Sequence, residues 1–328
     1  FIRVPLPAAM MTTSIGVAMK FPLDLGVVTR PRAAGAGTGR CTRIIGGLAV
    51  LALAGLLQSC SLMKLAYNQA PELAYWQLDR HFDFTDAQSL QVKADLDKLQ
   101  AWHRQTQLPG YIETLQKLQQ QMPADMDAAA ACAIYTDVRG KLVALARQAE
   151  PPMATLVGSL QAGQLKNLER RFAKGNDEYR EDFLEASPKA QREKRYKEAV
   201  KRAEMLYGRL EKKQLAVIER RIDASHFDAP RSYAEKIRRQ QDALHTLRPL
   251  VGGQAAPEKT QAAVRGLFER TMTSPDASYR DYIEKLTQDA CVTIAELHNS
   301  TTPAQRHKAV ETLQRYEQDF RTLNAQKS

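Results

Sequence analysis

The chain has 328 residues, of which 44% are hydrophobic and 26% charged, and its formal net charge is +10 at pH 7. It is long enough to bury a sizeable core. Half of the net charge belongs to residues 1–59, so the total overstates how basic the rest of the chain is. The composition gives little support to a nucleic-acid-binding protein, and we expect no nucleic acid as a partner.

An apolar run at 44–57 follows Arg40 and Arg43 and ends shortly before Cys60. As a helix it would be about 21 Å long, which is short for a membrane span of roughly 20 apolar residues. A basic flank and a short apolar run are typical of a signal peptide. We predict a leader over 1–59 with the signal peptide at 40–59; the alternative is a core helix that ends in Cys60. Residues before 40 are expected to be untranslated or disordered.

Leu57, Gln58, Ser59 and Cys60 resemble the lipobox of bacterial lipoproteins, although Gln58 departs from its commonest pattern. The resemblance implies that the Cys60 thiol receives a diacylglycerol, that its amine receives an acyl chain, and that Cys60 begins the mature chain. Each buried methylene contributes ~0.8 kcal/mol, so such lipids hold a protein on a bilayer. Ser61, in place of Asp, implies the outer membrane of the bacterial envelope, facing the periplasm.

Cys132 and Cys291 are the two cysteines of the predicted mature chain. Each lies on an apolar stripe of helical spacing, and the stripe of Cys132 includes Leu142 and Leu145. In an oxidising compartment the pair can form a disulfide, which would stabilise by about 4–5 kcal/mol in the chain-entropy model. The alternative is two buried free thiols on separate core faces. Without nearby histidines the two cysteines form no zinc site, and we expect no metal.

From residue 60 onward the sequence predicts an all-α fold, an elongated multi-helix bundle that follows a cleaved lipoprotein signal peptide. Apolar residues recur three and four positions apart, and the alternation and hairpin turns of strands are missing. A helical periplasmic domain is predicted over 60–328, and a sub-boundary near 249–258 would divide it into two bundles. Helix breaks are expected at the prolines of 108–110, 122–123, 151–152, 187–188, 229–230, 249–257, 274–275 and 302–303.

Four short elements have glutamine at their fifth position. In the first and last, Thr85 and Thr302 stand three residues before the glutamine, as in a capping box. Gln161 and Glu211 replace the threonine in the two central elements, where the capping argument is weaker. The elements are either capped, solvated helix surface or a repeated recognition element. They are "FTDAQ", "LQAGQ", "LEKKQ" and "TTPAQ", which end at Gln88, Gln164, Gln214 and Gln305.

These elements resemble the Leu-Thr-x-x-Gln signature of the Spy-type periplasmic chaperones. A wider resemblance begins at residues 64–88, "KLAYNQAPELAYWQLDRHFDFTDAQ", directly after the lipobox. This segment is similar to the opening of a family of uncharacterised proteobacterial lipoproteins with a domain of unknown function. The resemblance extends from residue 60 to about residue 325. It implies a helical envelope lipoprotein and supplies no mechanism.

Residues 187–213 carry the strongest charge bias, with ten Lys or Arg and four Glu. This segment is either a solvated helix face or a surface for an anionic membrane or partner. The histidines are scattered without ligand spacing, and no nucleophile elbow or phosphate-binding glycine loop is present. We therefore expect no enzyme, no cofactor beyond the lipid on Cys60, and no small-molecule substrate.

The function predicted from the sequence is a lipid-anchored, periplasm-facing binding protein, chaperone-like or linked to stress. Its expected partners are the membrane, through the anchor, and a protein partner or client in the envelope. A passive structural envelope lipoprotein is the first alternative. A cell-wall or lipid enzyme is the second, and no Glu stands in the apolar and aromatic surroundings that such chemistry would need.

Overall fold

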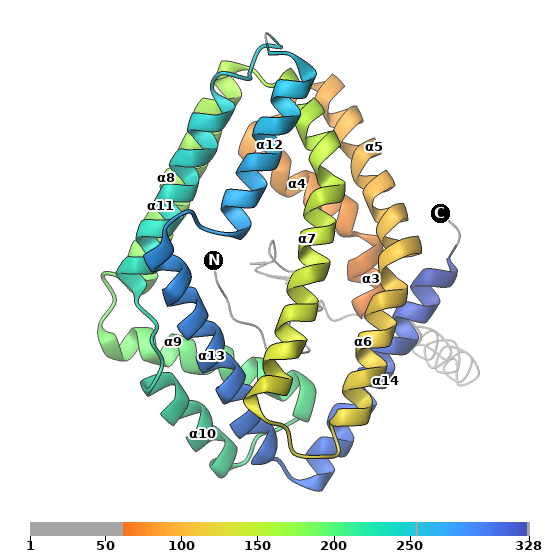
Figure 1. Ribbon diagram of the computed structural model, residues 1–328, viewed down its shortest axis with the longest axis vertical. Coiled ribbons are helices and arrows are strands. Elements are labelled where there is room, and N and C mark those ends of the chain that lie inside the picture. The colour runs from red at the N-terminus through yellow and green to blue at the C-terminus, as the bar shows by residue number, and fades with distance from the viewer. Residues whose placement is uncertain (1–61, 254, 327–328) are drawn as a thin grey trace, which may run out of the picture.

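The computed structural model describes residues 62–253 and 255–326, and the regular secondary structure of this part of the chain is entirely helical (Figure 1). The predicted all-α, multi-helix fold is confirmed. The elements are α3 (Leu62–Asn68), α4 (Ala70–Phe82), α5 (Asp86–Trp102), the π-helical turn η1 (His103–Gln107), α6 (Leu108–Gln121), α7 (Ala128–Ser159), α8 (Ala162–Phe183), α9 (Pro188–Tyr207), α10 (Lys212–Asp223), α11 (Ala229–Leu247), α12 (Pro257–Met272), α13 (Ala277–Asn299) and α14 (Pro303–Ala325).

The predicted leader over 1–59 and the lipobox of Leu57, Gln58, Ser59 and Cys60 lie outside the described residues. The first described helix, α3, begins at Leu62. Of the helices in residues 62–253 and 255–326, none combines the length and the apolar composition that crossing a bilayer requires.

Most helices begin where the sequence predicts a break, because a short polar side chain caps the first free N–H groups. Ser187 Oγ accepts from the backbone N–H of Ala190 at 3.2 Å, at the start of α9. Asp228 caps α11 in the same way, with its Oδ1 2.9 Å from the backbone nitrogen of Arg231. A proline follows each cap in the first turn, where its missing N–H removes no helical hydrogen bond.

The predicted break at Pro151 and Pro152 is wrong, because both prolines lie inside α7, which runs for 32 residues. Each proline removes the hydrogen bond to the carbonyl four residues earlier, at Arg147 and Gln148. Both of those residues are exposed, so water can satisfy the released carbonyls. Near Pro109 the chain also stays helical, since α5, η1 and α6 follow one another without a loop.

Helix packing divides most of the chain into two similar units. In the first unit, α4 packs on α5 and α8, and α5 packs on α7. In the second unit, α9 packs on α10 and α14, and α10 packs on α13. Figure 1 shows the first unit in the upper part of the molecule and the second in the lower part. Helices α4, α5, α7 and α8 therefore correspond in order to α9, α10, α13 and α14.

Each unit has its own hydrophobic core, and the long helix α7 belongs to both. The upper core includes Phe82, Val92, Leu156, Val157, Leu160, Leu165, Leu168, Leu247, Leu250 and Val264. The lower core includes Leu115, Leu118, Met122, Ile134, Val138, Leu206, Ile218, Leu297, Leu313 and Leu323. The connection between α11 and α12 covers the proposed sub-boundary near 249–258, and Leu250 from this connection packs into the upper core.

Candidate functional site

The four predicted glutamines meet in two pairs, one in each unit. In the first unit, Gln164 Nε2 donates to Gln88 Oε1 at 2.8 Å, and Gln88 Nε2 donates back at 3.2 Å. In the second unit, Gln214 Nε2 donates to Gln305 Oε1 at 2.9 Å, and Gln305 Nε2 donates back at 3.2 Å. We call these pairs the upper junction, Gln88 with Gln164, and the lower junction, Gln214 with Gln305.

Each glutamine also holds backbone groups at the places where two helices are joined. Its Oε1 accepts from the backbone N–H of the residue before its own helix, at 3.0 Å for Thr85, 2.8 Å for Gln161, 2.6 Å for Glu211 and 3.0 Å for Thr302. Its Nε2 donates to a backbone carbonyl of the opposite helix connection. The acceptors for Gln88, Gln164, Gln214 and Gln305 are the carbonyls of Ser159, Asp83, Ser300 and Arg209, respectively.

This arrangement explains why the shared residue is glutamine and not threonine. A glutamine amide offers two donor hydrogens and an oxygen with two lone pairs, and both junctions use all of them. All four side chains are buried, so an unmatched group would lack water as a partner. Glu has no amide donors, and Thr cannot reach the opposite connection. The junctions therefore fix how the helices meet, and the four elements act as structural caps. In the two central elements the glutamine makes the same contacts without a threonine three residues before it.

The lower junction has a buried histidine behind it. His298 is fully buried, and its Nε2 lies 2.8 Å from the carbonyl oxygen of Ala124. A carbonyl only accepts, so Nε2 carries the proton and Nδ1 accepts from the Tyr207 hydroxyl at 2.9 Å. Burial lowers the pKa of His298, which keeps the ring neutral. The sequence did not single out His298 or Tyr207 as a pair, because a lone histidine at a helix end belongs to no recognisable motif.

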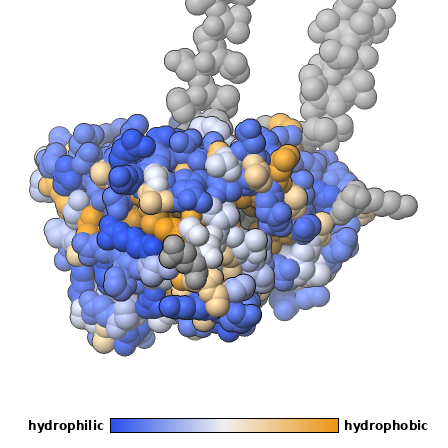
Figure 2. All heavy atoms as spheres, turned by 90° about the horizontal axis from the view of Figure 1, so that it is seen from above, coloured by the Kyte–Doolittle hydropathy of each residue, from blue (hydrophilic) through white to orange (hydrophobic). Residues whose placement is uncertain are grey.

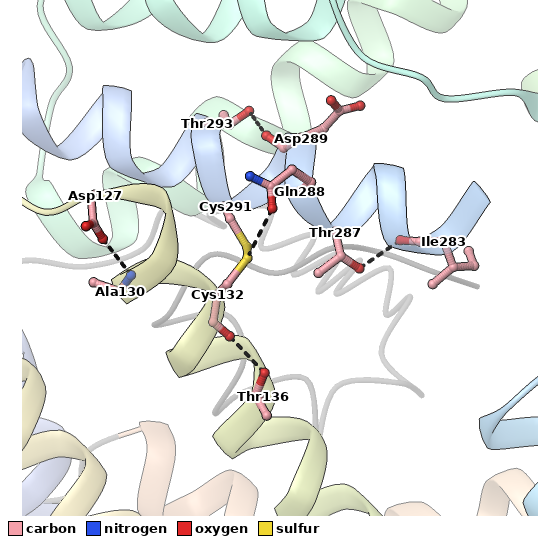
Figure 3. The surroundings of a disulfide bond; sticks show 10 residues. All are labelled: Asp127, Ala130, Cys132, Thr136, Ile283, Thr287, Gln288, Asp289, Cys291 and Thr293. Atoms are coloured by element: carbon pink, nitrogen blue, oxygen red, sulfur yellow. Dashed lines mark hydrogen bonds between the residues drawn. A yellow bond between two sulfur atoms is a disulfide. The ribbon is translucent and has the colours of Figure 1, made fainter. Parts of the chain in front are cut away.

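A disulfide joins Cys132 of α7 to Cys291 of α13, with Cα atoms 5.3 Å apart (Figure 3). Both cysteines lie at the lower core, so the bond fastens the beginning of α7, which runs on into the upper core, to the second unit. Cys291 is buried, whereas Cys132 is partly exposed. Gln288 Oε1 lies 3.8 Å from Cys132 Sγ, a contact and not a hydrogen bond, because a disulfide sulfur carries no proton.

The segment nearest to Cys60 is fixed on the body of the protein. Tyr67 of α3 is buried, and a hydrogen bond of 3.0 Å joins its hydroxyl to His103 Nδ1. Asn68 accepts from the guanidinium of Arg104 at 3.2 Å. Both partners come from the π-helical turn, whose extra residue per turn presents adjacent side chains to α3. Burial lowers the pKa of His103 to about 4 and raises that of Tyr67 to about 12.

The basic segment 187–213 forms α9 and the start of α10, and many of its cations have acidic partners. Arg192 pairs with Glu219 and Asp223, at 2.9 and 2.5 Å. Lys194 pairs with Asp182 at 2.5 Å. These contacts favour the solvated, ion-paired face over an anionic binding surface. Figure 2 shows a different face, the molecule seen from above, which is largely hydrophilic with some hydrophobic side chains visible between the polar ones.

The middle of α7 departs from the sequence prediction. Leu142 and Leu145 were expected on the core stripe of Cys132, yet every residue from 142 to 146 is partly exposed. This stretch, "LVALA", lies between Val138 in the lower core and Ala154 in the upper core. We call residues 142–146 the apolar waist. The sequence could not show its exposure, because five consecutive apolar residues surround the helix and single out no face.

In residues 62–253 and 255–326 no three His, Cys, Asp or Glu side chains lie close enough together to hold a metal ion. The buried carboxylate of Glu235 accepts from Arg238 at 2.7 Å and from Arg239 at 2.8 Å, and these hydrogen bonds hold its pKa below its usual range against the effect of burial. It is an ionised, paired group and not a proton donor.

Comparisons with known proteins give one match. A family model described as a family of unknown function (DUF6279) matches residues 80–256. The searches of curated proteins and of solved structures each found no match. The matched segment begins near the end of α4 and ends just before α12, so it includes the complete upper junction and, of the lower junction, only Gln214.

Proposed function

The chain belongs to the family of unknown function DUF6279, and we propose that this member is a lipid-anchored envelope protein that binds polypeptide segments without transforming them. The observation that carries the proposal is the apolar waist, residues 142–146, which stays partly exposed between two well-packed cores. A contiguous apolar patch that stays in contact with water is a candidate binding surface.

The partner that fits the apolar waist is an exposed apolar segment of a partly folded protein. Burying such side chains against Leu142, Val143 and Leu145 would contribute about 25 cal/mol per Å². The waist offers no row of free backbone groups, because α7 satisfies its own, so recognition would depend on apolar contact and not on sequence. This supports a chaperone-like role, in which many clients are bound weakly.

The anchor belongs to the same proposal. Lipids on Cys60 would tether a body whose first described helix begins at Leu62 and whose Tyr67 is already buried. With so few residues between them, the body would stay close to the bilayer, at the periplasmic face of the outer membrane. In cells, Cys60→Ala should abolish incorporation of labelled palmitate and release the protein from membranes. Unchanged labelling and sedimentation of this variant would refute the anchor.

Suppression of aggregation tests the binding function. The chain from residue 61 onward should keep a chemically unfolded client soluble at a near-stoichiometric ratio. A double variant, Leu142→Gln with Leu145→Gln, should lose this effect while keeping its helical circular dichroism. The matched control is Leu90→Gln, which changes a leucine that is 74% exposed on α5. Equal suppression by the double variant would exclude the waist as the binding surface.

A passive structural lipoprotein is the second candidate. This role is favoured because the polar groups of both junctions and the buried carboxylate of Glu235 form their hydrogen bonds within the chain. The disulfide between α7 and α13 also suits a rigid spacer. No suppression of aggregation, together with one reproducible envelope partner after crosslinking in intact cells, would support this role. The enzyme alternative would need release of wall or lipid products that a single Glu substitution stops.

A further inference from the structure

A hollow of about 950 Å³ lies away from the junctions and the apolar waist. It forms where the ends of α8 and α10 meet the beginnings of α9 and α11. Its size falls within the range of small-ligand pockets in proteins, roughly 300–1,000 Å³. The residues that matter to its chemistry are Phe183, Phe227, Tyr233, Arg192, Arg195 and His226.

Aromatic rings form one wall of this hollow. Phe183 and Phe227 meet edge to face, with ring centres 6.1 Å apart. Tyr233 stacks on Tyr179 at 5.5 Å, and Tyr179 in turn contacts Phe183 at 5.0 Å. The rings come from α8, from α11 and from the connection between α10 and α11, and each holds the next in place. A flat or branched apolar group would find a preformed surface here.

Arg195 supplies a positive charge without a counter-ion. Its guanidinium carbon lies 4.7 Å from the centre of the Phe227 ring. In the described part of the chain it makes no ion pair or hydrogen bond, and Asp223 and Asp289 act on it only at longer range. Arg195 is half-buried, so its cation is partly removed from water, and this burial lowers its pKa. An unpaired, partly desolvated cation destabilises a fold unless something else compensates for it.

The acids around the hollow have hydrogen-bond partners other than Arg195. Arg195 is therefore the cation of the hollow that is left to bind an anionic group of a ligand. The pairs are Asp223 with Arg192 at 2.5 Å, Asp289 with His226 at 2.9 Å, and Asp228 with the backbone N–H of Arg231 at 2.9 Å.

We propose that this hollow binds a carboxylate attached to an aromatic or branched apolar group, with the carboxylate on Arg195 and the apolar group against Phe183, Phe227 and Tyr233. The guanidinium fork matches the two oxygens of a carboxylate, and its stacking on Phe227 leaves its edge free to donate. Such a ligand is either the free C-terminus of a peptide that ends in an apolar residue or a free aromatic acid.

Calorimetric titration of the full chain tests the proposal with three probes. N-acetylphenylalanine represents a peptide C-terminus, 3-phenylpropanoate represents a free acid, and N-acetylphenylalaninamide lacks the negative charge. We expect saturable binding of at least one acid and none of the amide. The tighter of the two acids identifies the source of the ligand. Absence of saturable binding by both acids, or equal binding of the amide, would overturn the proposal.

Variants separate this site from nonspecific attraction. Arg195→Gln should weaken binding of the acids by about tenfold or more, because a charge-assisted hydrogen bond is lost. Lys197→Gln removes the same charge from the same helix, at a side chain that is 72% exposed and paired with Glu193, and should bind normally. Arg195→Lys keeps the charge without the fork and should weaken binding by an intermediate factor while leaving the fold intact. Equal affinities of wild type, Arg195→Gln and Arg195→Lys would refute the role of Arg195.

Discussion

The upper and lower junctions share one hydrogen-bond arrangement and differ in what lies behind it. Behind the upper junction, Asn167 and Arg171 of α8 donate to the carbonyl of Arg80 at the end of α4, so the support stays within the first unit. Behind the lower junction, His298 donates to the carbonyl of Ala124, outside the second unit. The upper junction is therefore supported from within its own unit, whereas the lower junction is bonded to the connection between α6 and α7.

The connection between α6 and α7 is what the lower junction attaches. Asn299 accepts from the backbone N–H of Met126 and donates to its carbonyl, both at 2.9 Å. Arg306 donates to the carbonyl of Pro123 at 3.0 Å and to the carboxylate of Asp125. Because α7 runs from the lower core into the upper core, and Gln88 of the upper junction donates to the carbonyl of its last residue, Ser159, the two junctions are connected through α7.

The disulfide offers the strongest way to break this coupling. Reduction, or Cys132→Ser with Cys291→Ser, should destabilise by about 4–5 kcal/mol in the chain-entropy model, because 159 residues separate the cysteines. We expect thermal unfolding by circular dichroism to change from one transition to two. Hydrogen exchange should then assign the earlier transition to the second unit. A single transition at an unchanged temperature would show that noncovalent contacts alone couple the units.

Removing one glutamine from each junction tests whether their surroundings matter. Gln214 is completely buried, whereas Gln88 is 7% exposed. Gln214→Ala should lower the free energy of unfolding by about 3 kcal/mol, since Gln305 loses its partner where water cannot enter. Gln88→Ala should lower it by about 2 kcal/mol, because the edge of that junction can be hydrated. Urea unfolding measures both losses of stability. Equal losses would mean that the groups behind the lower junction add nothing to the stability of the fold.

Acid should weaken the contacts around the lower core through two histidines, the buried His298 and the half-buried His103. His103, whose pKa burial lowers to about 4, stays neutral in the folded chain, while the unfolded chain takes up a proton near its ordinary pKa of about 6.5. The unfolded state then binds more protons, so this stability is present above pH about 6.5 and is lost as the pH falls toward about 4. The loss is roughly 3 kcal/mol for His103, and His298 adds to it in the same direction.

Melting temperatures between pH 7.5 and 5 would check this dependence. The wild type should lose stability across that range, before most carboxylates are protonated. His103→Gln should show a shallower slope, because glutamine does not titrate. The exposed His307, which is 77% exposed on α14, supplies the matched control as His307→Gln. A wild-type slope that His103→Gln leaves unchanged would contradict the assignment.

The sequence predicted the helical fold and most helix starts because these depend on local patterns. Apolar spacing and the proline-marked caps at Ser187 and Asp228 are signals within a few residues of one another. It also singled out the four junction glutamines, yet not which would face which, since Gln88 and Gln164 are brought together only by packing. The break predicted at Pro151 and Pro152 was wrong for a reason that depends on packing. The carbonyls of Arg147 and Gln148 lose their helical hydrogen bonds, and the helix tolerates this loss because both residues are exposed to water.

The smallest expected effect concerns the hydroxyl groups behind the two junctions. Tyr207→Phe removes the donor to His298 Nδ1 without changing the ring, at a tyrosine that is 4% exposed. Because the imidazole nitrogen is then buried without a partner, we expect a loss of about 1–2 kcal/mol. The control at the upper junction is Tyr75→Phe, whose hydroxyl donates to Ser89 Oγ at 3.0 Å.

Tyr75 is partly exposed, so water can replace its hydroxyl at Ser89, and the expected loss is about 0.5 kcal/mol or less. The two variants remove the same atom from the same residue type, so the difference between them isolates the effect of burial behind the lower junction. Urea unfolding resolves it if both proteins keep the wild-type slope. If Tyr75→Phe proved the more damaging change, the upper junction would be the one that the rest of the molecule depends on.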